Sequence, residues 1–158
     1  MILKNNKYIL VGILSFSISS LLIAYYIEYV LGHKPCNLCL IERIPYFIAL
    51  ILTLFLLIVN RLEKIILIIM LLSFLFGATV SFYHFGIEQG FFNESLVCNL
   101  GNDDVSDKDK LLKQLEQSTV VSCKNVTFRF LGLSLTTINF FFSLILSSII
   151  IKIIIKHE

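Results

Sequence analysis

Four long stretches without a charged residue dominate this chain of 158 residues. A helix needs about 20 mainly apolar residues to cross a hydrocarbon layer about 30 Å thick. Three stretches reach or nearly reach that length, and the second is shorter, so its helix must begin earlier in the chain. The stretches are Tyr8–Ile27, Ile44–Val59, Ile65–Tyr83 and Phe130–Ile151. None shows the polar face of a surface helix, so the sequence predicts an all-α membrane protein rather than a water-soluble bundle.

The predicted fold is one membrane domain over residues 1–158, a four-transmembrane-helix antiparallel bundle with a long outer loop. The predicted spans cover approximately residues 8–28, 40–60, 65–84 and 130–152, and the outer loops approximately 29–39 and 85–129. The first apolar run is too long for a cleaved signal sequence and lacks a small-residue cleavage site after it. We therefore expect it to be retained as a membrane span.

Basic residues gather on the side of the membrane that holds both termini. Glu63 and Glu158 are the acidic residues there, against six basic ones: Lys4, Lys7, Arg61, Lys64, Lys152 and Lys156. Because cytoplasmic loops carry the excess of lysine and arginine, this side is predicted to be cytoplasmic. Five tyrosines fall near the outer ends of the first three spans, as in an interfacial aromatic belt: Tyr25, Tyr26, Tyr29, Tyr46 and Tyr83.

The outer loop between the third and fourth spans contains the one sizeable polar segment of the chain. Within it, residues 106–117, "SDKDKLLKQLEQ", are typical of a short helix. Ser106 and Asp109 have the spacing of a capping box, and the leucines form a narrow apolar stripe. Such a helix lies either on the membrane surface or against the rest of the loop.

All four cysteines are predicted to lie on the non-cytoplasmic side: Cys36, Cys39, Cys98 and Cys123. An even number of cysteines facing an oxidising compartment indicates disulfide chemistry. One CxxC followed by two isolated cysteines matches a zinc site poorly, so we expect no metal. Structural disulfides are the alternative, although a CxxC bridge closes a very small loop and constrains the unfolded chain little.

The segment "HKPCNLCLIER", residues 33–43, has features of a reactive dithiol. If a helix starts at Pro35, which suits a first helical turn, both Cys36 and Cys39 lie in that turn, where amide donors favour the thiolate. At 100° per residue, Cys36, Cys39 and Arg43 share a sector of about 60°. Arg43 then either faces an electron acceptor beside Cys39 or, alternatively, snorkels to lipid phosphate or pairs with Glu42.

A dithiol that becomes a disulfide gives up two electrons and two protons, which need an acceptor. The chain has no dinucleotide-binding fingerprint, no haem motif and no set of iron–sulfur ligands. A lipid-soluble quinone is the natural acceptor at the edge of a bilayer. A cation near its carbonyl oxygen would stabilise the charge that develops on reduction.

Three motifs in the same order as in a known family give the chain a specific resemblance. They are "KPCNLCLIER" (34–43), "YHFGIEQGFF" (83–92) and "CKNVTFRFLGLS" (123–134). With the four spans, they make the sequence similar to the DsbB family of bacterial inner-membrane thiol–quinone oxidoreductases. Family members commonly have a tryptophan in the third motif, where this chain has Phe128, so the position stays aromatic.

The resemblance implies a redox relay. Cys98 and Cys123 look like the loop pair that oxidises a periplasmic DsbA-type thiol oxidase, with Cys98 forming the mixed disulfide. Cys36 and Cys39 look like the membrane-proximal pair, and Cys39 corresponds to the cysteine that contacts the quinone.

Two further residues are implied to bind the cofactor, which is ubiquinone or menaquinone. Arg43 matches the quinone-site arginine of the family, and His84 is a second candidate, which alternatively caps the third helix at the interface. The implied partners are the thiol oxidase, membrane lipid and the quinone pool, without nucleic acid. Other readings are a sister oxidase with a different dedicated partner, or a non-catalytic membrane scaffold with structural disulfides.

Overall fold

The computed structural model describes residues 2–59, 62–93, 98, 123, 129–130 and 133–156. In these residues, four helical segments are long and apolar enough to span a membrane: Lys7–Tyr29, Asn37–Ile58, Glu63–Glu88 and Leu135–Ile155. The predicted all-α membrane fold is therefore confirmed. The short helix predicted for residues 106–117 lies outside the described residues.

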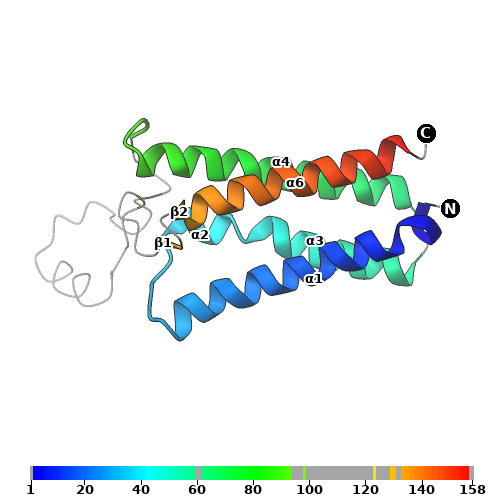
Figure 1. The fold of residues 1–158 in the computed structure, drawn as a ribbon, viewed down its shortest axis with the longest axis horizontal. Helices are drawn as coiled ribbons and strands as arrows, with labels where there is room; N and C mark the ends of the chain where they lie inside the picture. The colour runs from blue at the N-terminus through cyan, green and yellow to red at the C-terminus, as the bar shows by residue number, and fades with distance from the viewer. Residues whose placement is uncertain are drawn as a thin grey trace, which may run out of the picture.

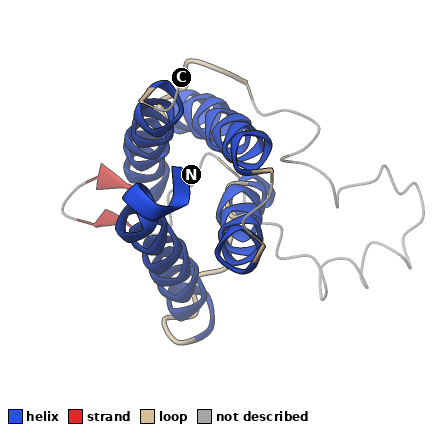
Figure 2. Cartoon of the chain, turned by 90° about the vertical axis from the view of Figure 1, so that its right-hand side faces the viewer, coloured by secondary structure: helices blue, strands red, loops and turns tan. Residues whose placement is uncertain are grey.

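The long helices form an antiparallel bundle, with both chain ends at one end of it and the strands and α2 at the other (Figure 1). A view along the bundle shows the helices grouped around one interior (Figure 2). Helix α4 packs against α6 and α3, and α1 packs mainly against α3. The elements are α1 Ile2–Tyr29, α2 Asn37–Ile41, α3 Ile44–Ile58, α4 Glu63–Glu88, β1 Arg129–Phe130, β2 Leu133–Ser134 and α6 Leu135–Ile155.

The second span is interrupted between α2 and α3. Pro45, in the first turn of α3, has no N–H to donate to the carbonyl of Ile41, and its ring would clash with that carbonyl in a continuous helix. The break leaves Glu42 and Arg43 between the two helices. The expected continuous helix from the two cysteines to Arg43 is therefore interrupted, although Glu42 and Arg43 keep right-handed helical backbone angles. The span begins within the cysteine motif, as expected.

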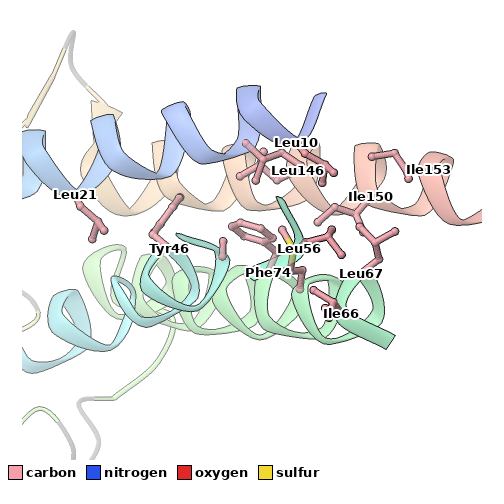
Figure 3. Close-up of a cluster of buried hydrophobic side chains, with 13 residues drawn as sticks. Leu10, Leu21, Tyr46, Leu56, Ile66, Leu67, Phe74, Leu146, Ile150 and Ile153 are labelled. Carbon is pink, nitrogen blue, oxygen red and sulfur yellow. The ribbon is translucent and has the colours of Figure 1, made fainter. Parts of the chain in front are cut away.

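A buried apolar cluster joins α1, α3, α4 and α6 (Figure 3). Ala49, Met70, Phe74 and Ile150 within it are completely buried. Large apolar side chains on the outside, such as Ile51, are more than half exposed, as expected of a lipid-facing surface. This core holds the four long helices together.

Small residues let the helices approach closely next to the break. A Cβ atom added to Gly77 of α4 would lie 2.9 Å from Cγ of Pro45. Close backbone approach at small residues is a common way to pack helices in membranes. This contact holds the start of α3 directly against α4.

Helix α6 begins later than the sequence pattern predicted, because the residues before it form a small antiparallel ladder. In β1 and β2, Arg129 pairs with Ser134 and Phe130 with Leu133. Ser134 then caps α6, since its side chain accepts a hydrogen bond from the backbone N–H of Thr137 at 3.3 Å. The cap fixes the first turns of α6, which carry Thr136 and Asn139.

Candidate functional site

Cys36 and Cys39 form a close dithiol at the start of α2. Both are free thiols, and their Sγ atoms are 2.7 Å apart. Cys36 is the N-cap of the helix, and its sulfur accepts a hydrogen bond from the backbone N–H of Cys39 at 3.3 Å. Cys36 is buried and Cys39 is half-buried, so the second cysteine is the more accessible of the pair.

The surroundings of Cys36 do not favour its thiolate, whereas the sequence pattern led us to expect that they would. The hydrogen bond with Cys39 raises the pKa of Cys36 above its ordinary value, and burial raises it further, outweighing the opposite effect of His84. The N-cap position acts in the opposite sense, because there the sulfur accepts the hydrogen bond from the backbone N–H of Cys39. Cys36 therefore holds its proton until a base removes it.

The two loop cysteines lie beside this dithiol. Cys98 and Cys123 are almost fully buried and belong to the same apolar cluster as Cys36, Leu38 and Ile87. Burial raises the pKa of Cys123, and a hydrogen bond with Cys98 adds to the effect. All four cysteines therefore gather at one end of the bundle.

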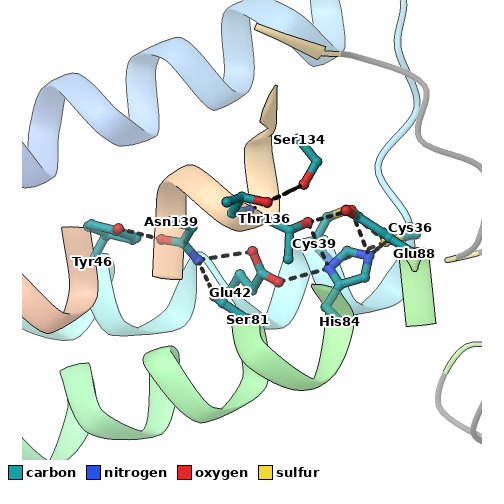
Figure 4. Close-up of polar contacts among 11 residues, drawn as sticks. Cys36, Cys39, Glu42, Tyr46, Ser81, His84, Glu88, Ser134, Thr136 and Asn139 are labelled. Carbon is teal, nitrogen blue, oxygen red and sulfur yellow. Dashed lines mark hydrogen bonds and ion pairs between the residues drawn. The ribbon is translucent and has the colours of Figure 1, made fainter. Parts of the chain in front are cut away.

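His84 connects the dithiol to a polar network inside the bundle (Figure 4). Its side chain is buried, with Nε2 lying 3.5 Å from Sγ of Cys36 and Nδ1 lying 2.8 Å from Oε1 of Glu42. A histidine that caps a helix at the interface would be exposed, so the alternative reading of this residue is wrong. The imidazole instead lies between a thiol and a carboxylate, as an acid–base group would.

The network continues from Glu42 to α6 and α4. Asn139 donates hydrogen bonds to Oε2 of Glu42 at 2.9 Å and to Oγ of Ser81 at 2.7 Å. Tyr46 donates its hydroxyl hydrogen bond to Asn139. Tyr46 is buried, so this tyrosine packs inside the bundle, which was the alternative to a place in the interfacial aromatic belt.

Glu88 is a second carboxylate near His84, on the next turn of α4. Thr136 donates a hydrogen bond to Oε1 of Glu88 at 2.7 Å, and the same oxygen lies 3.9 Å from Nε2 of His84. The other oxygen, Oε2, is buried without a hydrogen-bond partner. A buried carboxylate oxygen without a partner is costly, which marks Glu88 as a functional candidate.

The sequence reasoning missed Glu42, Glu88 and Asn139, although each left a signal. Glu42 immediately precedes Arg43. Glu88 follows His84 by four residues, and this spacing places His84 and Glu88 on one helix face. Asn139 is a polar amide within the apolar stretch of the fourth span. A polar side chain at such a depth is by default a functional hypothesis.

Arg43 is held by α1 rather than by its neighbour Glu42. Its Nη1 atom lies 2.6 Å from Oε2 of Glu28, and the two side chains are 13% and 20% exposed. The guanidinium carbon lies 5.1 Å from the centre of the Tyr25 ring, within the range of a cation–π contact. These two contacts fix the cation at the rim of the interior.

A cavity of about 360 Å³ lies where these groups meet. Cys39, Arg43, His84 and Glu88 contribute to its wall, and apolar side chains of α1 and α6 form much of the rest. This combination of apolar walls and a few convergent polar groups is typical of small-molecule sites. Of the predicted site residues, Cys36, Cys39, Cys123, Arg43 and His84 line the cavity, and Cys98 packs in the neighbouring cluster.

The site does not have the composition of a structural zinc centre. The sulfurs of Cys36 and Cys39 and a nitrogen of His84 lie within 4.8 Å of one another. Structural zinc sites take four ligands, and the described part of the chain adds no fourth group to this set. The three residues lie on one cavity wall with Arg43, and we interpret them as redox and acid–base groups.

Comparison with known proteins agrees with this interpretation. The family model for disulfide bond formation protein DsbB matches residues 6–153. Uncharacterized protein RP370 of Rickettsia prowazekii (strain Madrid E) is 30% identical, in an alignment that covers 87% of this chain and 82% of the relative. The match supports an oxidoreductase role in disulfide bond formation, and the four spans make the chain a multi-pass membrane protein. The chain belongs to the DsbB family.

Proposed function

We propose that the protein oxidises a soluble DsbA-type dithiol protein and passes the electrons through two cysteine pairs to a membrane quinone. Cys98 and Cys123 receive electrons from the soluble partner, and Cys36 and Cys39 pass them to the quinone. The observation that carries the proposal is the cavity, whose wall includes Cys36, Cys39 and Arg43 together. The proposed result is a continuous supply of oxidised partner for disulfide formation.

The residues around the cavity fit a quinone head group. The volume lies within the usual range for small-molecule sites, about 300–1,000 Å³. Apolar side chains such as Phe16 and Phe142 suit a ring and the start of a lipid tail, and Arg43 supplies a cation for a carbonyl oxygen. A bound quinone supplies an acceptor for two electrons and two protons.

The side chains of this site have separate tasks in the proposed reaction. Cys39, the more accessible thiol, faces the cavity and contacts the acceptor. His84 takes the proton that the hydrogen bond with Cys39 and burial keep on Cys36. Arg43 stabilises negative charge that develops in the cavity, in the way that fixed cations and dipoles stabilise charged transition states.

The proposed location is the bacterial inner membrane, with both termini in the cytoplasm and the cysteines on the periplasmic side. The basic residues near the termini support this orientation through the positive-inside rule. Both chain ends also lie at the end of the bundle opposite α2 (Figure 1), the helix that begins beside Cys36. A DsbA-type partner is a strong oxidant, about −120 mV, so its reoxidation needs a sink such as the respiratory quinone pool.

The direct test mixes the purified protein with a reduced DsbA-type partner and either ubiquinone or menaquinone. We expect quinone reduction to depend on both protein and partner, with one quinone reduced for each partner dithiol oxidised. Absorbance of the quinone and titration of the partner's thiols measure the two half-reactions. Thiol oxidation without quinone reduction would contradict the proposal. The absence of both reactions would favour a membrane scaffold with structural disulfides.

Cys98 is proposed to form the mixed disulfide with the partner. A partner that lacks its resolving cysteine should form a covalent complex with the wild-type protein in which Cys98 and Cys123 are joined as a disulfide. The partner's thiolate attacks one sulfur of that disulfide, and the other sulfur leaves as a thiolate. Non-reducing electrophoresis measures the complex, and peptide mapping should place the link at Cys98 and find Cys123 as a free thiol. A link at Cys123 would reverse the assignment.

A further inference from the structure

Glu88 combines three features that the proposed redox reaction leaves unused. Its side chain is 6% exposed, it lines the cavity, and its Oε2 atom has no hydrogen-bond partner. The other oxygen is fixed by the Thr136 hydroxyl at 2.7 Å. One oxygen is therefore held in place, while the other is buried without a hydrogen-bond partner beside the cavity that Glu88 lines.

The surroundings of Glu88 connect it to the dithiol through a single side chain. Nε2 of His84 is 3.5 Å from Sγ of Cys36 on one side and 3.9 Å from Oε1 of Glu88 on the other. The first distance is a thiol hydrogen bond, and the second is an ion-pair distance. A proton can pass between the two groups only when the Glu88 carboxyl moves closer to His84 than this distance.

Glu42 makes His84 suitable for accepting a proton. Its Oε1 atom lies 2.8 Å from Nδ1, and Asn139 fixes its second oxygen at 2.9 Å. A carboxylate in this position orients the ring and stabilises the imidazolium that forms, as an acidic residue does beside a catalytic histidine. Because the pKa of Cys36 is raised, oxidation of this thiol needs such a base.

We propose that Glu88 carries the proton of Cys36, received through His84, to the molecule bound in the cavity. The S–H bond of Cys36 breaks as an N–H bond forms at Nε2 of His84. That proton then passes to the Glu88 carboxylate and from there to an oxygen of the acceptor. Cys36 and Cys39 together lose two electrons and two protons to form the disulfide, and the quinone of the proposed function gains both. The proton of Cys39, which itself lines the cavity, would pass to the acceptor without His84 or Glu88.

Glu88→Gln is the informative variant because the amide oxygen keeps the Thr136 hydrogen bond while the group loses its ability to carry a proton. General acid–base groups contribute about 100-fold or more to a reaction, so we expect quinone reduction to slow by about 100-fold. We also expect the solvent deuterium isotope effect on this step to increase. Glu88→Asp keeps the carboxyl and should restore part of the rate. Glu63→Gln, the same change at the other end of α4, should behave as wild type.

A second measurement needs no quinone. In protein with Cys36 as its single cysteine, alkylation by iodoacetamide reports the thiolate fraction. We expect alkylation to slow by about tenfold in His84→Gln, the equivalent of one pKa unit. Glu88→Gln should show a smaller decrease, and Glu63→Gln should show none.

The outcomes separate this inference, which rests on the proposed function, from that function itself. If the wild type reduces quinone and Glu88→Gln does so equally fast, Glu88 is only an anchor for Thr136 and the inference is wrong. It is also wrong if Glu88→Gln slows quinone reduction but leaves the isotope effect and the alkylation rate unchanged. If the wild type reduces no quinone, the proposed function fails, and the alkylation rates still decide whether Glu88 and His84 act on Cys36.

Discussion

Cys39→Ser should reduce quinone reduction to the background rate, while one round of partner oxidation persists. A serine hydroxyl cannot form a disulfide with Cys36, so electrons that reach the loop pair have no route into the cavity. Cys98 and Cys123 together still hold one oxidising equivalent in their disulfide form. A reduced partner should therefore become oxidised once per protein molecule and no further. The measurement is a titration of the partner thiols that remain after mixing. The number of thiols lost per protein molecule reports this limit.

Cys36→Ser is the matched variant for this experiment. The sulfur of Cys36 is buried beside Cys39 in the wild-type protein. Its replacement also prevents the Cys36–Cys39 disulfide, so we expect the same limit of one round of partner oxidation. Repeated turnover in Cys39→Ser would contradict the relay, because it would mean that the loop cysteines reduce the quinone without this pair. Thermal stability of both variants equal to that of the wild type would show that the loss of quinone reduction is chemical and not a result of unfolding.

Arg43→Ala should produce the second large effect, a decrease of about 100-fold in kcat/KM for the quinone, the scale seen when one fixed donor to a developing charge is removed. Arg43→Lys keeps the charge but loses the planar guanidinium, so it should be the milder change. Thiol exchange with the partner should continue in both variants, because exchange requires only thiolates within reach. Quinone reduction and partner exchange, measured separately, give the comparison.

Glu28→Gln distinguishes the two roles that the structure allows for Arg43. The arginine forms an ion pair with Glu28 at 2.6 Å, so Arg43→Ala also leaves a half-buried carboxylate without its partner. If Arg43 acts on the quinone, Glu28→Gln should keep most of the quinone reduction, since the cation remains at the cavity. If Glu28→Gln loses as much activity as Arg43→Ala, the ion pair is structural and the quinone is oriented by other side chains.

The sequence alone was sufficient to predict the membrane bundle. Long uncharged stretches have few alternatives, because a segment such as Ile65–Tyr83 can satisfy its backbone groups in a membrane only as a helix. The cysteine motif likewise predicted a redox dithiol from local spacing. Residues 37–41 do form a helix that begins beside Cys36, as that motif suggested.

The helix break and the partners of the charged residues were decided only by the tertiary structure. Helical periodicity placed Arg43 on the face of Cys39, but Pro45 interrupts the helix and Gly77 of α4 allows α3 to pack there. Which carboxylate meets Arg43 depends on how α1 lies against α3, and that arrangement has no signature in local spacing.

The polar side chains around His84 show the same division between local and long-range information. His84 and Glu88 share one face of α4, which the sequence contains, whereas Glu42 and Thr136 reach them from other helices. Hydrogen bonds between residues far apart in the chain form only when the bundle packs. The sequence by itself determined that this protein is a membrane dithiol protein, and tertiary packing decided which side chains surround the dithiol.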